Sequence, residues 1–186
     1  MSMKETLEVI NRMEADGIIG RYAIGGAIAA LNYLELGSTE DLDIFVSFDE
    51  AVGKFRSGLI TLTPILNYLA AKGYREFQKE GILIAGWPVQ FLPVADDLEA
   101  EGLAEAEEID MDTPRGKVQT RILRPEHLIA NALKVGRAKD ILRIAQFLEE
   151  RAIALPTLVE LIQRHSLQKE WKTFCLRAGI IDPLGL

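Results

Sequence analysis

The sequence contains few of the residues that stabilise secreted proteins or bind transition metals. It has one cysteine, Cys175, and two histidines among 186 residues. A single cysteine excludes an internal disulfide, so we expect a cytoplasmic protein. Cys175 lies near Trp171 and Phe174, and we expect all three side chains to pack in the core. His127 and His165 show no metal-ligand spacing and are expected at the surface or at helix ends.

The sequence also lacks long apolar runs and an even distribution of charge. Residues 81–95 are interrupted by Pro88, Gln90 and Pro93, so no membrane span is expected. The first residues carry charges at helical spacing, and we expect no signal peptide. The net charge is −7, with 8 basic and 21 acidic residues before Arg115, and 13 basic and 7 acidic residues from there on. The second part is the better place to meet an anion, although solvated helices explain the excess equally well.

What the sequence does contain is a strand–turn–helix–turn–strand pattern over residues 22–48. Its second strand carries Asp41 and Asp43 with one apolar residue between them, so the two carboxylates face one side while Leu42 and Ile44 face a core. Adjacent carboxylates repel each other unless a cation or open solvent intervenes. Ligands that are all oxygen favour Mg²⁺ or Mn²⁺ over zinc. The pattern therefore predicts a metal site.

Two glycines precede this strand at the start of a helix. Residues 22–24 form a short apolar strand, and Gly25 and Gly26 turn the chain into an alanine-rich helix predicted over 27–35. Glycines at this position permit unusual backbone angles and let an anion approach the unpaired N–H groups of the first turn. We therefore predict a phosphate site close to the metal site.

In this order, the glycine pair and Thr39-Glu40-Asp41-Leu42-Asp43 resemble the signature of the DNA polymerase beta superfamily of nucleotidyltransferases. The resemblance is to the small bacterial branch that includes minimal nucleotidyltransferases and abortive-infection toxins. Leu128-Ile129-Ala130 and the segment 136–140 are similar to the helical part that follows the catalytic domain in that branch. A second Asp-x-Asp, Asp110-Met111-Asp112, has no glycine turn before it and does not share the resemblance.

The resemblance and the residue pattern predict an α+β fold. A nucleotidyltransferase-like mixed β-sheet flanked by helices would occupy residues 1–124, and a helical bundle residues 125–186. The acidic tract 96–112, with nine carboxylates and no base, is expected to be a solvated helix and loop. An amphipathic helix is expected over 4–14, with Leu7, Ile10 and Met13 facing inward, and a second helix over 62–72 with Thr63 as its N-cap. A helix or loop is expected over 49–56, strands over 74–79, 81–86, 88–94 and 116–123, and four helices from 126 onward.

The resemblance implies a Mg²⁺-dependent enzyme that moves a nucleoside monophosphate from a nucleoside triphosphate to a hydroxyl on a small molecule, a protein or an RNA end. The implied roles fall into three groups: metal binding and catalysis by Asp41 and Asp43; phosphate binding by Gly25, Gly26 and Thr39, the last of which would alternatively fix the turn; and weaker triphosphate contacts by Lys134, Arg137 and Lys139.

Three positions depart from the family pattern. The third carboxylate is replaced by Gln90, which cannot act as a general base, although Asp96 and Asp97 follow closely. A lysine that contacts the triphosphate is replaced by Ala132, and an arginine by Gly37. These departures leave open a catalytically degenerate protein that binds a nucleotide or a partner, as in toxin–antitoxin systems. They also leave open a scaffold without a ligand. A homodimer or a partner protein is compatible with either reading.

Overall fold

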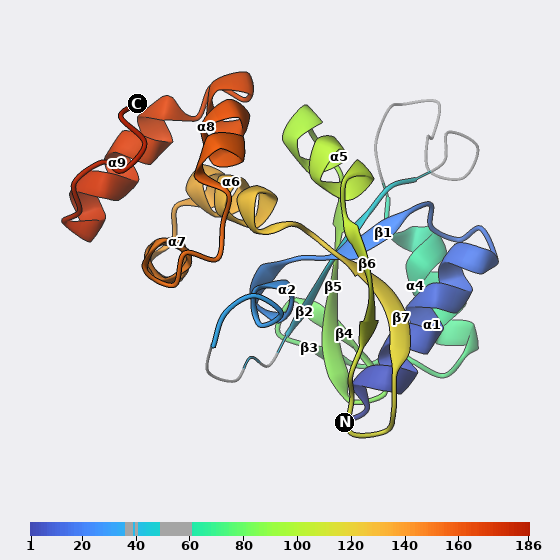
Figure 1. Cartoon of the computed structure of the whole chain (residues 1–186). Coiled ribbons are helices and arrows are strands. Elements are labelled where there is room, and N and C mark those ends of the chain that lie inside the picture. The colour runs from blue at the N-terminus through green and yellow to red at the C-terminus, as the bar shows by residue number, and fades with distance from the viewer. Residues whose placement is uncertain (36–38, 40, 49–60) are drawn as a thin grey trace.

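The computed structural model describes residues 1–35, 39, 41–48 and 61–186. It contains a mixed seven-stranded sheet with helices around it (Figure 1). This is the expected α+β class with a nucleotidyltransferase-like arrangement. None of the described helices is long and apolar enough to span a lipid bilayer.

The strand order is β3-β4-β5-β2-β1-β7-β6. Parallel pairing joins β2 to β5 and β1 to β7, whereas the other neighbours are antiparallel. The strands are β1 (Tyr22–Ile24), β2 (Leu42–Val46), β3 (Phe77–Gln78), β4 (Gly81–Ile84), β5 (Trp87–Pro93), β6 (Glu107–Met111) and β7 (Val118–Ile122).

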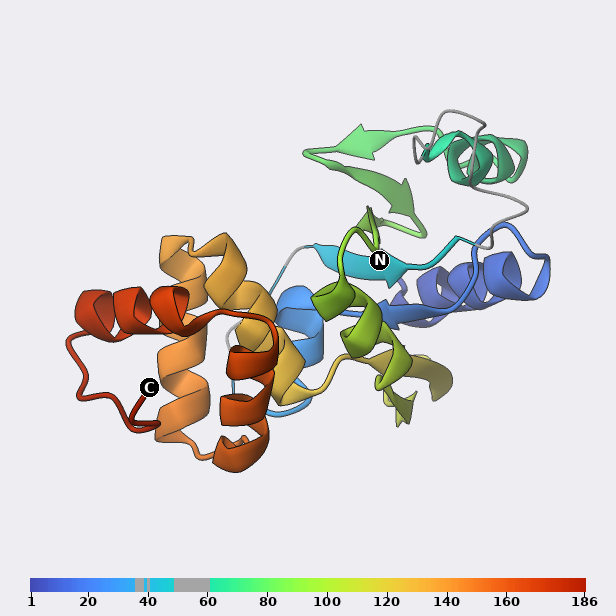
Figure 2. The same cartoon turned by 90° about the horizontal axis from the view of Figure 1, so that it is seen from above.

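The described helices are α1 (Met3–Ala15), α2 (Gly26–Ala30), α4 (Thr63–Ala71), α5 (Asp97–Ala104), α6 (Pro125–Val135), α7 (Ala138–Glu149), α8 (Leu155–Arg164) and α9 (Gln168–Ala178). Figures 1 and 2 place α1 and α4 together on one side of the molecule and the bundle α6–α9 on the opposite side. Helix α1 is amphipathic as predicted, because its apolar residues Leu7, Ile10 and Met13 are fully buried at helical spacing.

The C-terminal bundle agrees with the sequence prediction of four helices. Trp171, Phe174 and Cys175 are all buried in α9, as expected for core residues. The Trp171 indole N–H donates to Asp182 Oδ1 at 2.7 Å, so the polar edge of this buried ring is satisfied. Gly136 ends α6 in the left-handed conformation that favours glycine.

Several predicted elements differ from the structure, and the strand expected over 74–79 is limited to β3 (Phe77–Gln78). The acidic tract contains a helix, but its second part is the edge strand β6 rather than a loop. Tertiary pairing with β7 explains the difference, since Ile109 and Met111 are half-buried while Glu108 and Asp110 point to solvent. This alternation suits an edge strand, where outward charges discourage pairing with another chain.

The helix after the glycine pair is also shorter than predicted. It ends at Ala30, and the next N–H groups, of Asn32 and Tyr33, bond three residues back in a tighter turn. The Tyr33 hydroxyl lies 3.2 Å from Glu107 Oε2 and 3.3 Å from the Leu123 carbonyl oxygen, within hydrogen-bond distance of both, which ties this turn to the start of β6 and the end of β7. Thr63 is the first residue of α4 rather than its N-cap. The prediction for residues 49–56 lies outside the described residues.

Candidate functional site

The glycine pair and the second aspartate of the Asp-x-Asp motif meet at the start of α2. The Gly25 N–H donates to the backbone carbonyl of Asp43 at 2.9 Å, which continues the pairing of β1 with β2. Gly26 adopts a φ of +57°, and a Cβ built on it would overlap Asp43 Oδ2 and lie 2.9 Å from Asp43 Cγ. A Cβ on Gly25 would overlap the ring of Phe45. Both positions thus require glycine, for different reasons.

A cleft of about 320 Å³ opens beside this junction, between the sheet and the helices α6 and α7. Its volume is in the range of sites for small ligands. Six residues to which the sequence analysis drew attention as site positions line the cleft: Gly26, Asp43, Gln90, Ala132, Lys134 and Arg137. Side chains from distant parts of the chain complete its polar lining, namely Glu80, Glu99, Asn131, Asp140 and Arg143.

Asp43 is half-buried, and its surroundings disfavour the ionised form of its carboxylate. Burial, followed by the charge of Asp41, raises the pKa of Asp43, whereas Lys139, Arg137 and Arg143 lower it. Asp41 precedes β2 directly, and its Oδ1 accepts a hydrogen bond of 2.9 Å from the Thr39 hydroxyl. Two neighbouring carboxylates in this setting form an oxygen donor set that suits a hard divalent cation such as Mg²⁺.

Gln90 lies opposite Asp43 on the parallel strand β5. Its side-chain amide donates to Glu80 Oε2 at 3.3 Å, and Glu80 lines the cleft from the turn between β3 and β4. A carboxylate therefore does lie beside the expected third position, but it comes from the turn between β3 and β4. No pattern in the sequence distinguishes Glu80, because its position depends on how the β3–β4 hairpin pairs with β5.

Lys134 reaches the cleft but is engaged by carboxylates. Its ammonium group pairs with Asp96 and, at 2.9 Å, with Glu99 Oε1. Although partial burial lowers the pKa of Lys134, these carboxylates raise it above its ordinary value. Asp96 also accepts the Glu99 N–H as the N-cap of α5. Asp96 thus caps α5 and pairs with Lys134, and it does not replace the missing carboxylate. Asp97 is exposed in the first turn of α5.

The positive side of the cleft is organised by one buried carboxylate that the sequence reading missed. Asp140, 1% exposed, accepts from Arg137 Nε at 2.8 Å and from Arg137 Nη2 at 3.2 Å. Arg143 Nη1 lies 3.8 Å from Asp140 Oδ1, the oxygen that accepts from Arg137 Nη2. The hydrogen bond to Asp140 is the main cause that raises the pKa of Arg137. Lys139 is exposed in the first turn of the same helix.

Ala132, where the resemblance implies a lysine, is buried and lines the cleft. The guanidinium groups that line the cleft belong instead to Arg137, the N-cap of α7, and to Arg143 within α7. Gly37, where the resemblance implies an arginine, lies outside the described residues.

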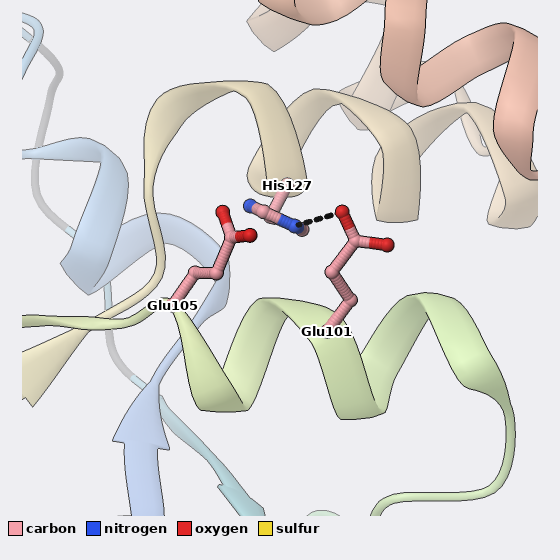
Figure 3. A group of neighbouring side chains, drawn as sticks. All are labelled: Glu101, Glu105 and His127. Carbon is pink, nitrogen blue, oxygen red and sulfur yellow. Dashed lines mark ion pairs between the residues drawn. The ribbon is translucent and has the colours of Figure 1, made fainter.

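A separate group of side chains capable of holding a metal ion lies between α5 and α6. Glu101, Glu105 and His127 offer ligand atoms that all lie within 4.8 Å of one another (Figure 3). His127 lies in the first turn of α6, at a helix end as expected, but its side chain is buried rather than at the surface, with 3% of it exposed. His165 is the C-cap of α8, as expected, and its Nε2 lies 2.7 Å from Glu101 Oε2. Sequence spacing missed the cluster because its glutamates and histidine lie on different helices.

Comparison with known proteins supports the fold. The chain resembles the crystal structure of an antigenic nucleotidyltransferase-like protein from Paracoccidioides brasiliensis, with a TM-score of 0.53 and 16% sequence identity. The alignment covers 95% of this chain and 90% of that chain. No family model and no curated protein matches the sequence. The chain therefore has a nucleotidyltransferase-like fold.

Proposed function

We propose that this protein is a Mg²⁺-dependent nucleotidyltransferase that moves a nucleoside monophosphate from a nucleoside triphosphate to a hydroxyl acceptor. The observation that carries the proposal is the position of the Asp43 carboxylate directly against Gly26, in a cleft with guanidinium groups on its other wall. The order of the motifs is the support for placing the chain in the small bacterial branch of the superfamily.

Asp41 and Asp43 would hold the metal ion. A bound divalent cation supplies neutralisation of phosphate charge and orientation of the transferred phosphoryl group. It also relieves the repulsion between the two carboxylates, which together with burial raises the pKa of Asp43. The amide of Gln90 and the carboxylate of Glu80 are further oxygen donors near this position.

Arg137 and Arg143 would bind the triphosphate. Asp140 orients the Arg137 guanidinium through two hydrogen bonds, so less side-chain freedom is lost when an anion binds. The helix α2 has five residues, and the Gly25 N–H is already bonded to Asp43. The proposed role of the glycine pair is therefore close approach of the phosphates, with the arginines supplying most of the charge. Thr39 would fix Asp41 through its hydrogen bond.

Lys134 and Lys139 have unequal parts in this proposal. Lys134 would have to leave Asp96 and Glu99 before it reached a phosphate, so it would contribute less than the arginines. Lys139 is exposed, and its charge already acts on Asp43. It would attract the triphosphate to the mouth of the cleft.

The decisive experiment uses the second Asp-x-Asp motif as its control. Incubation with each labelled nucleoside triphosphate and Mg²⁺, in a cell extract that supplies acceptors, should yield a labelled product. Asp41→Asn together with Asp43→Asn should abolish transfer. Asp110→Asn together with Asp112→Asn makes the same chemical change at exposed positions of β6 and its end, and should leave transfer unchanged. Equal activity in the two double variants would exclude the proposed site.

A second function is favoured by one observation, the presence of Gln90 opposite Asp43. The neutral amide of Gln90 cannot remove the proton from the attacking hydroxyl. General-base assistance of this kind is worth roughly 10² to 10⁴ in rate, so its absence would slow transfer strongly. The alternative is a protein that binds a nucleoside triphosphate or a partner without turnover, as one half of a toxin–antitoxin type pair. Mg²⁺-dependent binding of a nucleotide without product in any extract would support it. Multiple turnover would exclude it.

The remaining features of the proposal follow from the substrate. Nucleoside triphosphates are abundant in the cytoplasm, which agrees with the location expected from cysteine usage. A hydroxyl on a small molecule, a protein or an RNA end is proposed as the acceptor. Assembly as a homodimer or with a partner protein is part of the same proposal.

A further inference from the structure

A buried histidine lies between two glutamates at the junction of α5 and α6. Glu101, and Glu105 at the C-terminal cap of the same helix, are four residues apart and project toward His127 near the start of α6 (Figure 3). The distance between Glu101 Oε1 and His127 Nε2 is 3.8 Å. Two atoms that each lie about 2.1 Å from one tetrahedral ion are about 3.4 Å apart. Small side-chain shifts would therefore bring this pair to bonding distance of a single ion.

The imidazole of His127 has no hydrogen-bond partner among the residues that the structure describes. Both ring nitrogens are shielded from solvent, and neither has a partner. Burying a polar group without a hydrogen-bond partner is unfavourable, so such groups call for an explanation. Gly102 contributes to this burial, because a Cβ there would lie 3.2 Å from His127 Cδ2. A glycine is thus the residue that lets the ring lie against α5.

The geometry favours a metal ion over a simple ion pair. Two carboxylates, those of Glu101 and Glu105, lie close to a ring whose nitrogens make no hydrogen bond to any described residue. A neutral imidazole nitrogen with a free lone pair and ionised carboxylates are the forms that bind metals.

We propose that Glu101, Glu105 and His127 bind a zinc ion that joins α5 to α6. One imidazole nitrogen and two carboxylate oxygens suit Zn²⁺ better than Mg²⁺, which prefers oxygen ligands alone. The fourth position would be taken by water. The site is separate from the cleft that contains Asp43 and stands whether or not the chain transfers nucleotides.

Arg164 is the group that competes with the ion. Its Nη1 pairs with Glu101 Oε1, the same oxygen that faces His127, while Glu101 Oε2 faces His165. The Arg164 side chain is 53% exposed, so it can turn into solvent when the ion binds. Removal of Arg164 should therefore strengthen zinc binding, an effect that an ordinary salt bridge would not produce.

The proposed ion would support one wall of the nucleotide cleft. Glu99 of α5 and Lys134 of α6 both line that cleft and pair with each other. The ion would lie at the other end of the same helix junction, since Glu105 caps the C-terminus of α5 and His127 lies in the first turn of α6. Its role is to hold the two helices together rather than to take part in transfer.

The test uses metal-stripped full-length protein without an affinity tag, in an Asp41→Asn, Asp43→Asn background that removes the other candidate metal site. Calorimetric titration with Zn²⁺ should show one bound ion per chain, and thermal unfolding should show a higher Tm with Zn²⁺ than without it. Mg²⁺ should neither bind nor raise the Tm. Glu105→Gln, at an exposed position, should weaken zinc binding at least tenfold. Glu108→Gln, an exposed glutamate on β6 outside the cluster, should leave zinc binding unchanged.

Two further variants complete the test. Arg164→Gln should tighten zinc binding severalfold, and His127→Asn should abolish the imidazole-dependent absorption of bound Co²⁺. If His127→Asn fails to fold, the Glu105 and Arg164 variants still decide the proposal. Absence of saturable zinc binding, equal affinity in the Glu105 and Glu108 variants, or unchanged affinity after removal of Arg164 would each overturn the assignment.

Discussion

The carboxylate of Asp43 occupies the space that a side chain at position 26 would need. A Cβ on Gly26 would overlap Asp43 Oδ2, and the φ of +57° at this residue is in the region that favours glycine. The two residues are 17 positions apart in sequence and meet because β1 and β2 pair side by side. The glycine turn and the aspartate strand therefore form one structural unit, whose parts can be tested separately.

Gly26→Ala should destabilise the protein and displace Asp43. We expect a loss of about 2–3 kcal/mol, because a backbone cost of about 1–2 kcal/mol at positive φ adds to the steric overlap. Gly17→Ala is a matched control, since Gly17 has a φ of +69° with nothing within 4 Å of the added Cβ. Denaturant unfolding of both variants isolates the contribution of Asp43. Mg²⁺-dependent nucleotide binding should fall at least tenfold in Gly26→Ala alone, and similar losses in both variants would contradict this.

Asp43→Asn should stabilise the metal-free protein at neutral pH. The folded-state pKa of Asp43 is raised by burial and by Asp41, so the folded state binds its proton more tightly than the unfolded state. The penalty for its charge is absent below the ordinary range of aspartate and is imposed as the pH rises through the folded pKa. The Tm advantage of Asp43→Asn should therefore be largest at pH 7 and vanish once the pH falls below 3.8, the ordinary pKa of the aspartate side chain. About 1 kcal/mol corresponds to roughly 2–4 °C for a chain of this size.

The control for this prediction is Asp110→Asn, at an exposed position on β6, which should change Tm little at any pH. Addition of Mg²⁺ should raise the Tm of the wild-type protein and not that of Asp43→Asn. A variant that is less stable than the wild type at pH 7 without metal would show that the carboxylate is favourably paired there.

Asp140→Asn should weaken triphosphate binding through the arginines that it orients. The substitution removes the charge that holds Arg137 and faces Arg143, and we expect a loss of about 2 kcal/mol of stability. Arg137→Gln removes the exposed partner and leaves Arg143 beside Asp140, so its stability loss should be smaller. Inorganic triphosphate titrations should show weaker binding in both variants. Unchanged triphosphate affinity in Asp140→Asn would place the binding cations elsewhere.

Gln90→Asp should increase nucleotide transfer. The new carboxylate would face Asp43 from β5 and supply both a proton acceptor and a metal ligand. We expect roughly a 10²-fold faster turnover in Mg²⁺, with lower stability when metal is absent because a third negative charge joins the pair. Gln119→Asp, at an exposed position on β7, is the control for the change in net charge. No gain in transfer would favour a binding protein over an enzyme.

Several features of this molecule could be predicted from local sequence. The apolar spacing of Leu7, Ile10 and Met13 predicted α1, and the short apolar segment Tyr22–Ile24 with the glycines after it predicted β1 and its turn. The alternation around Asp43 placed Leu42 and Ile44 in the core, where both are fully buried. These predictions succeeded because periodicity and turn chemistry act between neighbours in sequence. The domain boundary at residues 124 and 125 stays a prediction.

Other features were decided only by the tertiary structure. The alternation along residues 107–111 was not recognised as a strand, because the acidic residues there are typical of a solvated segment. These residues form a strand because they pair with β7. Lys134 was expected to reach a phosphate, but its pairing with Asp96 depends on how α5 packs on α6. The burial of Asp140 and His127 could not be predicted from the local sequence either.

The sequence by itself thus determined the helices, most strands and the pair of motifs that meet at α2. Only the fold decided which charged groups are free, which are paired and which are buried. The physical reason is that helix and strand patterns arise from contacts a few residues apart, whereas the cost and the partners of a buried charge depend on groups brought together from distant parts of the chain.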